Sequence, residues 1–408
     1  MKKQIISFIA ILALAMPLAA QAEPELSLGG QYRINSYLLN DADGAGSVAA
    51  ARVRIRQNID LKFSDAFDTH LQINFGHITE GIGNHTGNNV GIRHAVMNYH
   101  FSEAATLTAG LVPLSDKFGD TLFSGDWDFN PVTFALSGNV GGTDYRLGWF
   151  KILEGTEGTT IKNDVTGFLV DLGGELGDVS IGAMGLGLRT PNAGNTDYEN
   201  NGWIGGRIAT EFDGIRIGAD VVASNVKKNA PNVTNSVTDS KGIQARLHAE
   251  GQFNGISMSI LGLYSTGKAA GEGYLSPQQI YGGQGYWGKT GVLNIQGPTD
   301  AGMDANMLRP GNNGYGLQSV QVGLGYSFTD ELSGYLGAGY YNAGKERVAG
   351  QGKNIGSDVY VQARYAFPDS PLALEVFGDF ASLGAAHYNS GGASRTVTAF
   401  GSRLQAEF

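Results

Sequence analysis

The amino-acid sequence predicts an all-β fold, a transmembrane antiparallel β-barrel. Apolar and polar side chains alternate with a period of two residues from residue 26 to the last residue, and no helical period of comparable length follows residue 22. Several strands end at an aromatic residue followed by a very short polar turn, whereas longer loops rich in Gly, Asn, Asp and Ser separate these hairpins. Mean hydropathy is slightly negative, which excludes a bundle of apolar helices but suits strands with one apolar face.

The N-terminal residues predict a cleavable secretory signal. Lys2 and Lys3 precede an apolar run over 5–18, and the small-residue site Ala20-Gln21-Ala22 follows. The apolar run is shorter than the roughly 20 residues that a membrane-spanning helix needs. We therefore expect a signal peptide over 1–22, a barrel over 23–408, and a location in the cell outer membrane.

Composition limits the kinds of partner that the protein can bind and the ways in which its fold can be stabilised. Removal of the two signal lysines takes the formal charge from −10 to −12, which argues against a nucleic-acid partner. The chain has no cysteine, so the exported fold must close without disulfides, and closed strand pairing can do this. The 62 glycines show no three-residue period, which excludes collagen.

The stretch 51–63 shows the two faces that a barrel strand requires. One face should meet lipid and the other water; the apolar face holds Val53, Ile55, Ile59, Leu61 and Phe63, and the polar face holds Arg52, Arg54, Arg56, Asn58, Asp60 and Lys62. A soluble sandwich could show the same alternation, but the strand ends favour the barrel. We expect the terminal aromatic residues to form one interfacial girdle rather than an apolar core beside ordinary hairpins: Phe63, Phe101, Phe212, Phe253, Phe328, Phe367 and Phe408.

The pattern predicts about 18 strands, an even number because both termini should lie on one side of the membrane. Sixteen is the alternative, since the strands over 131–175 are short and interrupted by glycine. Either number leaves an aqueous lumen.

Arginines at alternate positions are the sharpest local signal for function. Arg52, Arg54 and Arg56 should point into the lumen about 7 Å apart. Arg33 and Arg403 have the same polar-face parity, and barrel closure would make their strands neighbours. These five residues either brace the wall through acids on nearby strands or line a path for anions.

A long loop over 112–131, after the fifth strand, mixes Phe118 and Phe123 with several carboxylates. Because its rings need cover, we expect this third outer loop to fold inward and to form a constriction opposite the arginines; the carboxylates are Asp116, Asp120, Asp126 and Asp128. A loop that caps the barrel or contacts another copy is the alternative. A second insertion over 267–316 has no assigned role.

The signal, the alternating strands, the loop after the fifth strand and the terminal Phe408 resemble those of Gram-negative outer-membrane porins over nearly the whole mature chain. The resemblance implies passive diffusion through a constriction made by the inserted loop. It also implies that Phe400, Leu404 and Phe408 form the signal read by the barrel-assembly machinery.

A narrower resemblance concerns the stretch RHAVMNYHFSEAATLTAGLVPLSDKFGD. It is similar to the strand-turn-strand-loop of alginate-export-type and phosphate-selective porins, with Arg93, Tyr99 and Gly110 at the corresponding places. The extensive lysine patches of phosphate-selective channels are not evident in this chain, so phosphate is not the expected solute.

Other functions are less consistent with the residues. None of the seven histidines lies beside a recognised serine motif, so we expect no enzyme. No blade signature of a β-propeller repeats, and the Asn40–Gly44 turn lacks most ligands of a calcium loop, so no metal or cofactor is expected. The expected partners are outer-membrane lipid and small hydrophilic solutes or ions, with weak anion preference. A non-conducting adhesin or structural barrel is the alternative, and the sequence decides neither the solute nor between monomer and homotrimer.

Overall fold

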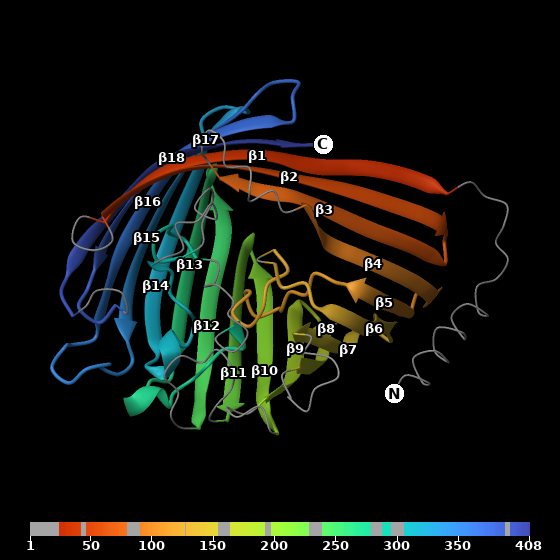
Figure 1. Cartoon of the computed structure of the whole chain (residues 1–408), viewed down its shortest axis with the longest axis horizontal. Helices are drawn as coiled ribbons and strands as arrows, with labels where there is room; N and C mark the ends of the chain where they lie inside the picture. The colour runs from red at the N-terminus through yellow and green to blue at the C-terminus, as the bar shows by residue number, and fades with distance from the viewer. Residues whose placement is uncertain are drawn as a thin grey trace.

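The computed structural model describes residues 24–41, 46–79, 90–126, 128–153, 164–191, 197–227, 239–278, 288–294, 306–387 and 392–408. The predicted signal peptide lies outside these residues. Eighteen antiparallel strands form one closed sheet (Figure 1): β1 (Glu25–Asp41), β2 (Gly46–Ser64), β3 (Phe67–Thr79), β4 (Val90–Ser102), β5 (Ala105–Leu111), β6 (Val132–Val140), β7 (Thr143–Leu153), β8 (Val165–Leu176), β9 (Val179–Pro191), β10 (Tyr198–Phe212), β11 (Ile215–Val226), β12 (Ser240–Phe253), β13 (Ile256–Ser265), β14 (Leu317–Ser327), β15 (Leu332–Ala343), β16 (Asn354–Ala366), β17 (Leu372–Leu383) and β18 (Arg395–Glu407). The expected strand count of 18 is confirmed.

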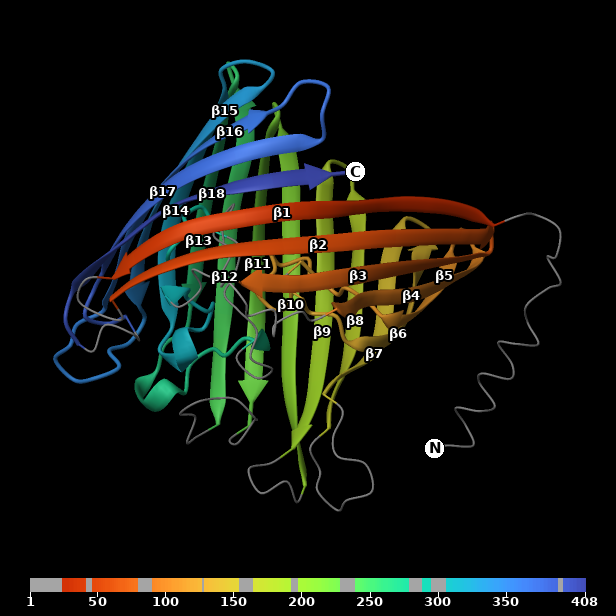
Figure 2. The ribbon, with the colours of Figure 1, turned by 45° about the horizontal axis from the view of Figure 1, so that its top comes forward.

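Pairing of the first and last strands closes the barrel. β1 pairs with β2 on one side and with β18 on the other (Figure 2). The chain terminus completes the seam, because Gly30 N–H donates to the Phe408 carbonyl at 2.7 Å and Phe408 N–H donates to the Gly30 carbonyl at 3.1 Å. Closure leaves no unpaired sheet edge.

The two ends of the barrel differ. Short turns join β2 to β3, β4 to β5 and each later even strand to the next odd one, and both barrel termini lie at this short-turn end. The long connections lie at the opposite, long-loop end. Two single-turn 3₁₀ helices, η1 (Ala269–Gly271) and η4 (Asn312–Gly314), lie in the connection between β13 and β14.

The outer surface is apolar and its short-turn edge is aromatic. Phe212 and Phe408 are 75% and 62% exposed, and the other expected girdle rings are exposed as well. Rings on the same strand face pack together, as in Tyr326 with Phe328 at 5.1 Å between centroids. The expected aromatic girdle is confirmed. No helix in the described part of the chain is long and apolar enough to cross a membrane.

Two apolar clusters lie inside the barrel, where only water would be expected in an open pore. One joins loop residues 112–129 to the inner faces of the β7–β11 wall, with Phe118, Leu122, Phe123, Phe129, Phe150 and Trp203 among its members. The other joins Val292, Leu293 and Leu308 to the inner faces of β13–β18 and β1, with Tyr341, Tyr360 and Phe377 among its members. Both long connections therefore pack against the wall and narrow the lumen.

Candidate functional site

Five arginines line the lumen on three neighbouring strands, and we call them the arginine ladder: Arg33 on β1, Arg52, Arg54 and Arg56 on β2, and Arg403 on β18. The register places Arg33 directly opposite Arg54, and Asn35 between Arg52 and Arg403. The closure of the barrel thus joins residues that are more than 340 positions apart in sequence into one basic surface.

Neutral side chains hold much of the arginine ladder. Arg33 Nε donates to Gln405 Oε1 at 2.6 Å, and Arg54 Nη2 donates to Gln31 Oε1 at 2.7 Å. These glutamines orient the guanidinium groups of Arg33 and Arg54. The Nε of Arg52 is buried and has no hydrogen-bond partner among the described residues. Arg403 differs, because it forms a salt bridge with Glu375 on β17.

Arg93 on β4 ties the inserted loop, residues 112–131, to the ladder. Its Nε forms a salt bridge with Asp128, and its Nη2 donates to the Gly125 carbonyl at 2.7 Å. Its Nη1 donates to Gln72 Oε1 at 2.8 Å on β3. Asp128 also accepts from Arg56 Nη2 at 3.5 Å. Although burial opposes it, the Arg93 and Arg56 guanidiniums hold the pKa of Asp128 below its usual range.

The tip of the inserted loop reaches the other side of the barrel. The backbone of the loop runs as a hairpin, since Leu114 N–H donates to the Phe129 carbonyl. Gln244 Nε2 on β12 donates to Thr121 Oγ1 at 2.7 Å. At Gly119 the loop backbone passes against the Arg246 guanidinium, where a Cβ would lie 1.7 Å from Nη1. Seven strands separate β4 from β12 one way around and nine the other, so the loop crosses the lumen.

Asp116 and Asp120 have different roles within the inserted loop. Asp116 is buried and its two oxygens accept backbone N–H bonds from Phe118, Asp120, Leu122 and Phe123 at 2.6–3.0 Å. Its carboxylate therefore holds the tip together instead of facing the ladder. Asp120 lines a cavity, and burial, together with the neighbouring Asp116, raises its pKa to about 7.

Of the four loop carboxylates expected opposite the arginine ladder, Asp128 is the one that forms a salt bridge with it among the described residues. Asp126 is exposed and lines a different cavity, together with Arg246 and Lys289. The expectation that Asp116 faces the ladder is therefore corrected. The physical reason is that the backbone N–H groups of the loop tip need an acceptor, and Asp116 provides it.

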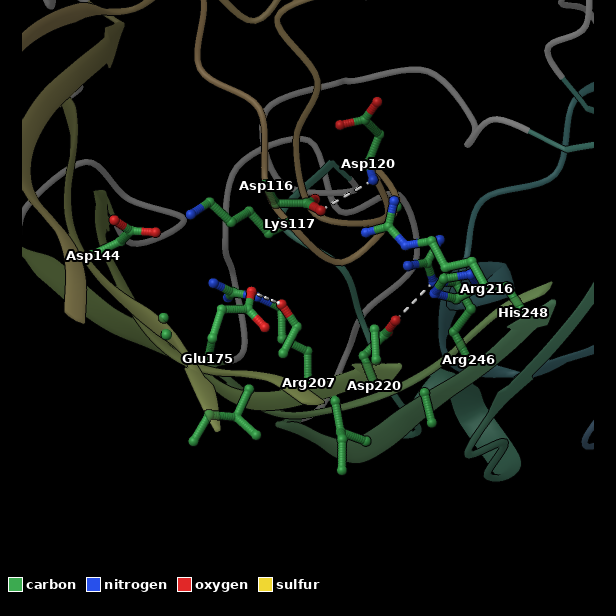
Figure 3. Close-up of a pocket in the computed structure, with 18 residues that line it drawn as sticks. Asp116, Lys117, Asp120, Asp144, Glu175, Arg207, Arg216, Asp220, Arg246 and His248 are labelled. Atoms are coloured by element: carbon green, nitrogen blue, oxygen red, sulfur yellow. Dashed lines mark hydrogen bonds and ion pairs between the residues drawn. The ribbon is translucent and has the colours of Figure 1, made fainter. Parts of the chain in front are cut away.

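Alternating charges cover the wall below the loop tip. Arg207 on β10, Asp220 on β11 and Arg246 on β12 are cross-strand neighbours in one row. Arg246 Nε donates to Asp220 Oδ2 at 2.8 Å, and Arg207 Nη1 donates to Asp171 Oδ1 at 2.8 Å. Figure 3 shows Arg207, Asp220 and Arg246 of the wall facing the loop residues Asp116, Lys117 and Asp120. The cavity between them has a volume of 410 Å³. These pairs of opposite charge connect neighbouring strands and so brace the wall.

The second insertion also enters the lumen. Lys289 borders two further cavities, of 590 and 490 Å³, that it shares with Glu250 on β12. The Trp203 indole N–H donates to the Leu275 carbonyl at 2.8 Å, which fixes the earlier part of the insertion to β10. Tyr281, Tyr286 and Trp287 of this insertion lie outside the described residues.

The sequence assigned no contact to two residues that the fold brings to this region, Arg93, which only the narrower resemblance named, and Lys289. Arg93 lies next to His94 in an ordinary strand pattern, and only the fold shows that it reaches the loop. Lys289 is one cation in a glycine-rich insertion without alternation. No group of three or more potential metal ligands of the His, Asp and Glu type occurs in the described part of the chain.

The structure is an 18-stranded transmembrane antiparallel β-barrel, a fold that matches the solved structures of outer-membrane porins. Among solved structures the chain is similar to Pseudomonas aeruginosa OccK2 (OpdF), with a TM-score of 0.61, 10% identity and coverage of 94% of this chain and 98% of the other. It is also similar to P. aeruginosa OccK1 (OpdK), with a TM-score of 0.59, 11% identity and coverage of 94% and 98%. Neither a protein-family model nor a curated protein sequence matches it.

A third similar structure is that of P. aeruginosa OpdK with vanillate, with a TM-score of 0.57, 11% identity and coverage of 94% of this chain and 99% of the other. At these identities the likeness establishes the fold. It supports the broader resemblance to porins, but not the narrower one to alginate-export-type or phosphate-selective porins.

Proposed function

We propose that this chain is an outer-membrane porin through which small hydrophilic solutes diffuse passively, with a weak preference for anions. The observation that carries the proposal is the arrangement in the lumen. A loop tied across the barrel holds Asp128 beside an arginine ladder that gathers five guanidinium groups on three neighbouring strands. An excess of arginine over carboxylate on this part of the wall gives it a positive potential.

The proposed path runs along the lumen from one end of the barrel to the other. A solute enters at the long-loop end, is narrowed beside the inserted loop, passes the arginine ladder, and leaves at the short-turn end. Carboxylates on the loop and arginines on the wall create a transverse field, which orients dipolar solutes. The step needs neither an energy source nor a cofactor.

Export and assembly belong to the same proposal. We infer that the signal over 1–22 is cleaved and that the assembly machinery inserts the barrel into outer-membrane lipid. Phe400 on the final strand and Phe408 directly after it are 61% and 62% exposed, and Leu404 shares their outward parity. We infer that the assembly machinery recognises this apolar outer face of the final strand.

Single-channel conductance of the refolded mature protein, in a planar bilayer under a salt gradient, tests the proposal. The comparison is between the native chain and a variant with Arg52, Arg54 and Arg56 changed to Ser. We expect stable conductance in both and a shift of the reversal potential towards cations in the variant. Three exposed lysines at the long-loop end, changed to Ser, provide the matched control: Lys241, Lys268 and Lys353.

A native chain that is folded but silent would instead favour a non-conducting adhesin or structural barrel. Conductance with cation preference in the native chain would retain the porin and overturn its anion preference.

A further inference from the structure

Lys289, in the second insertion, lines two adjoining cavities of the lumen. The larger cavity extends towards Arg216, Gln252 and Tyr335 at the short-turn end. The smaller one extends towards Asp120, Asp126 and Arg246 beside the inserted loop. The residues common to both linings are Glu250, Ser259 and Lys289.

The barrel wall holds the backbone of Lys289 from both sides. The Lys289 N–H donates to Gln321 Oε1 on β14 at 2.8 Å, and the Tyr335 hydroxyl on β15 donates to the Lys289 carbonyl at 3.1 Å. Gly337 on β15 makes this approach sterically feasible, because a Cβ there would lie 1.7 Å from the Lys289 carbonyl oxygen. Contacts with β14 and β15 therefore fix the backbone of Lys289 against the barrel wall.

The residues that follow Lys289 extend this attachment. Thr290 Oγ1 and the Tyr341 hydroxyl are 2.9 Å apart, and Leu293 N–H donates to Asp358 Oδ2 on β16 at 2.8 Å. Val292 and Leu293 are fully buried in the apolar cluster against β13–β18. Burying each of these side chains favours the attached state, so the lysine cannot leave the passage without exposing them.

The surroundings of the Lys289 ammonium group carry both signs of charge. Glu250 attracts it, whereas the Arg246 guanidinium repels it. Burial is the main reason that its pKa lies below its usual range. The opposite charges of Glu250 and Lys289 line both cavities, so a solute that passes from one cavity to the other meets a cation and an anion together.

We propose that Lys289 is a specificity-determining residue of the pore, held by Gln321, Tyr335 and Gly337, and that it selects for solutes with an anionic group at the junction of the two cavities. The proposal rests on the proposed porin function and adds a second selective position beyond the arginine ladder. One unit charge about 6 Å from a permeating ion raises the local occupancy of an anion and lowers that of a cation by about threefold each in water, so their ratio changes by about tenfold. Salt reduces this factor.

Because the chain has no native cysteine, charge at position 289 can be changed within one open channel. We would record Lys289→Cys in a planar bilayer under a salt gradient, before and after a cationic or an anionic methanethiosulfonate reagent. The variant should have an anion-to-cation permeability ratio up to about tenfold below that of the native chain at low salt, and a smaller difference at high salt. The cationic reagent should restore the ratio and the anionic reagent should lower it further.

Lys268→Cys, at an exposed position of the same insertion, is the matched control and should show no such change. A second variant, Gly337→Ala, keeps the lysine but displaces its backbone, and it should also lower the ratio. If Lys289→Cys fails to fold, Gly337→Ala and Lys289→Gln serve as the test. A conducting native channel with ratios unchanged in the Lys289 and Gly337 variants would overturn the inference, whereas a silent native channel would overturn the proposed function itself.

Discussion

At the residue scale, two aspartates of the inserted loop have different roles because their surroundings differ. Asp116 accepts four backbone N–H bonds and stabilises the tip, while Asp120, four positions later, faces a cavity. Four backbone N–H groups would lose their acceptor without the Asp116 carboxyl group, so Asp116 contributes more to the structure of the loop than Asp120. The Asp120 carboxyl group faces a cavity and can therefore exchange a proton with the solution.

Selectivity should depend on pH through Asp120. Burial and the nearby Asp116 raise the pKa of Asp120 to about 7, so this group loses its negative charge as pH falls from about 8 to 6. Loss of a negative charge favours anions, and the anion-to-cation permeability ratio should rise over this range. Reversal potentials at several pH values measure this, and Asp120→Asn should show the higher ratio throughout. An equal pH response in the variant would assign it to another group.

At the element scale, the inserted loop is a cross-connection. It is tied to β4 by Arg93 and to β12 by Gln244. Four large apolar side chains of the loop are buried against the wall, each favouring the folded-in state by about 1.5–3 kcal/mol: Phe118, Leu122, Phe123 and Phe129. Packing thus determines where the loop lies, and the polar ties determine its orientation.

Removing one polar tie should loosen the loop without unfolding the barrel. Arg93→Gln loses the salt bridge to Asp128 and the bonds to the loop carbonyls, whereas the apolar packing remains. We expect larger and noisier single-channel currents. Arg364→Gln, a half-exposed arginine of β16 near Glu375, is the control. Currents identical to those of the native chain would show that packing alone fixes the loop.

The sequence predicted elements better than it predicted contacts between them. Period-two alternation and aromatic strand ends determine strands and faces locally, which is why 18 strands and the girdle could be anticipated. The approach of Arg93 to the inserted loop, or of Lys289 to Glu250, depends on barrel curvature and on which loops fold inward. The need for glycine at position 337 is visible only in the structure, where the Lys289 carbonyl lies against it.

At the scale of the whole molecule, one seam decides whether the sheet becomes a barrel. Strands β1 and β18 pair from Gln31 with Glu407 to Asp41 with Val397. The same seam brings Arg403 beside Asn35 and therefore completes the basic surface. Closure and the candidate site are consequently coupled, since an open sheet would separate the arginines.

Deletion of Phe408 should weaken this closure. It removes both backbone hydrogen bonds to Gly30 and an exposed aromatic ring of the girdle, which together should lower the free energy of unfolding by about 1–3 kcal/mol. Urea titration in lipid vesicles measures the change, and gel mobility without heating measures the folded fraction. Phe367→Ala, another girdle ring, is the control for loss of an aromatic side chain alone. Equal stability of the deletion and this control would remove the special role of the terminus.

The cross-lumen position of the inserted loop also has a mechanical consequence. A thin cylinder of paired strands deforms most easily by flattening into an oval. A strut attached near β4 and β12 opposes that deformation across the diameter it joins. Lateral pressure from the surrounding lipid is then carried partly by the strut, and the bore keeps its cross-section while the membrane around it is compressed or stretched.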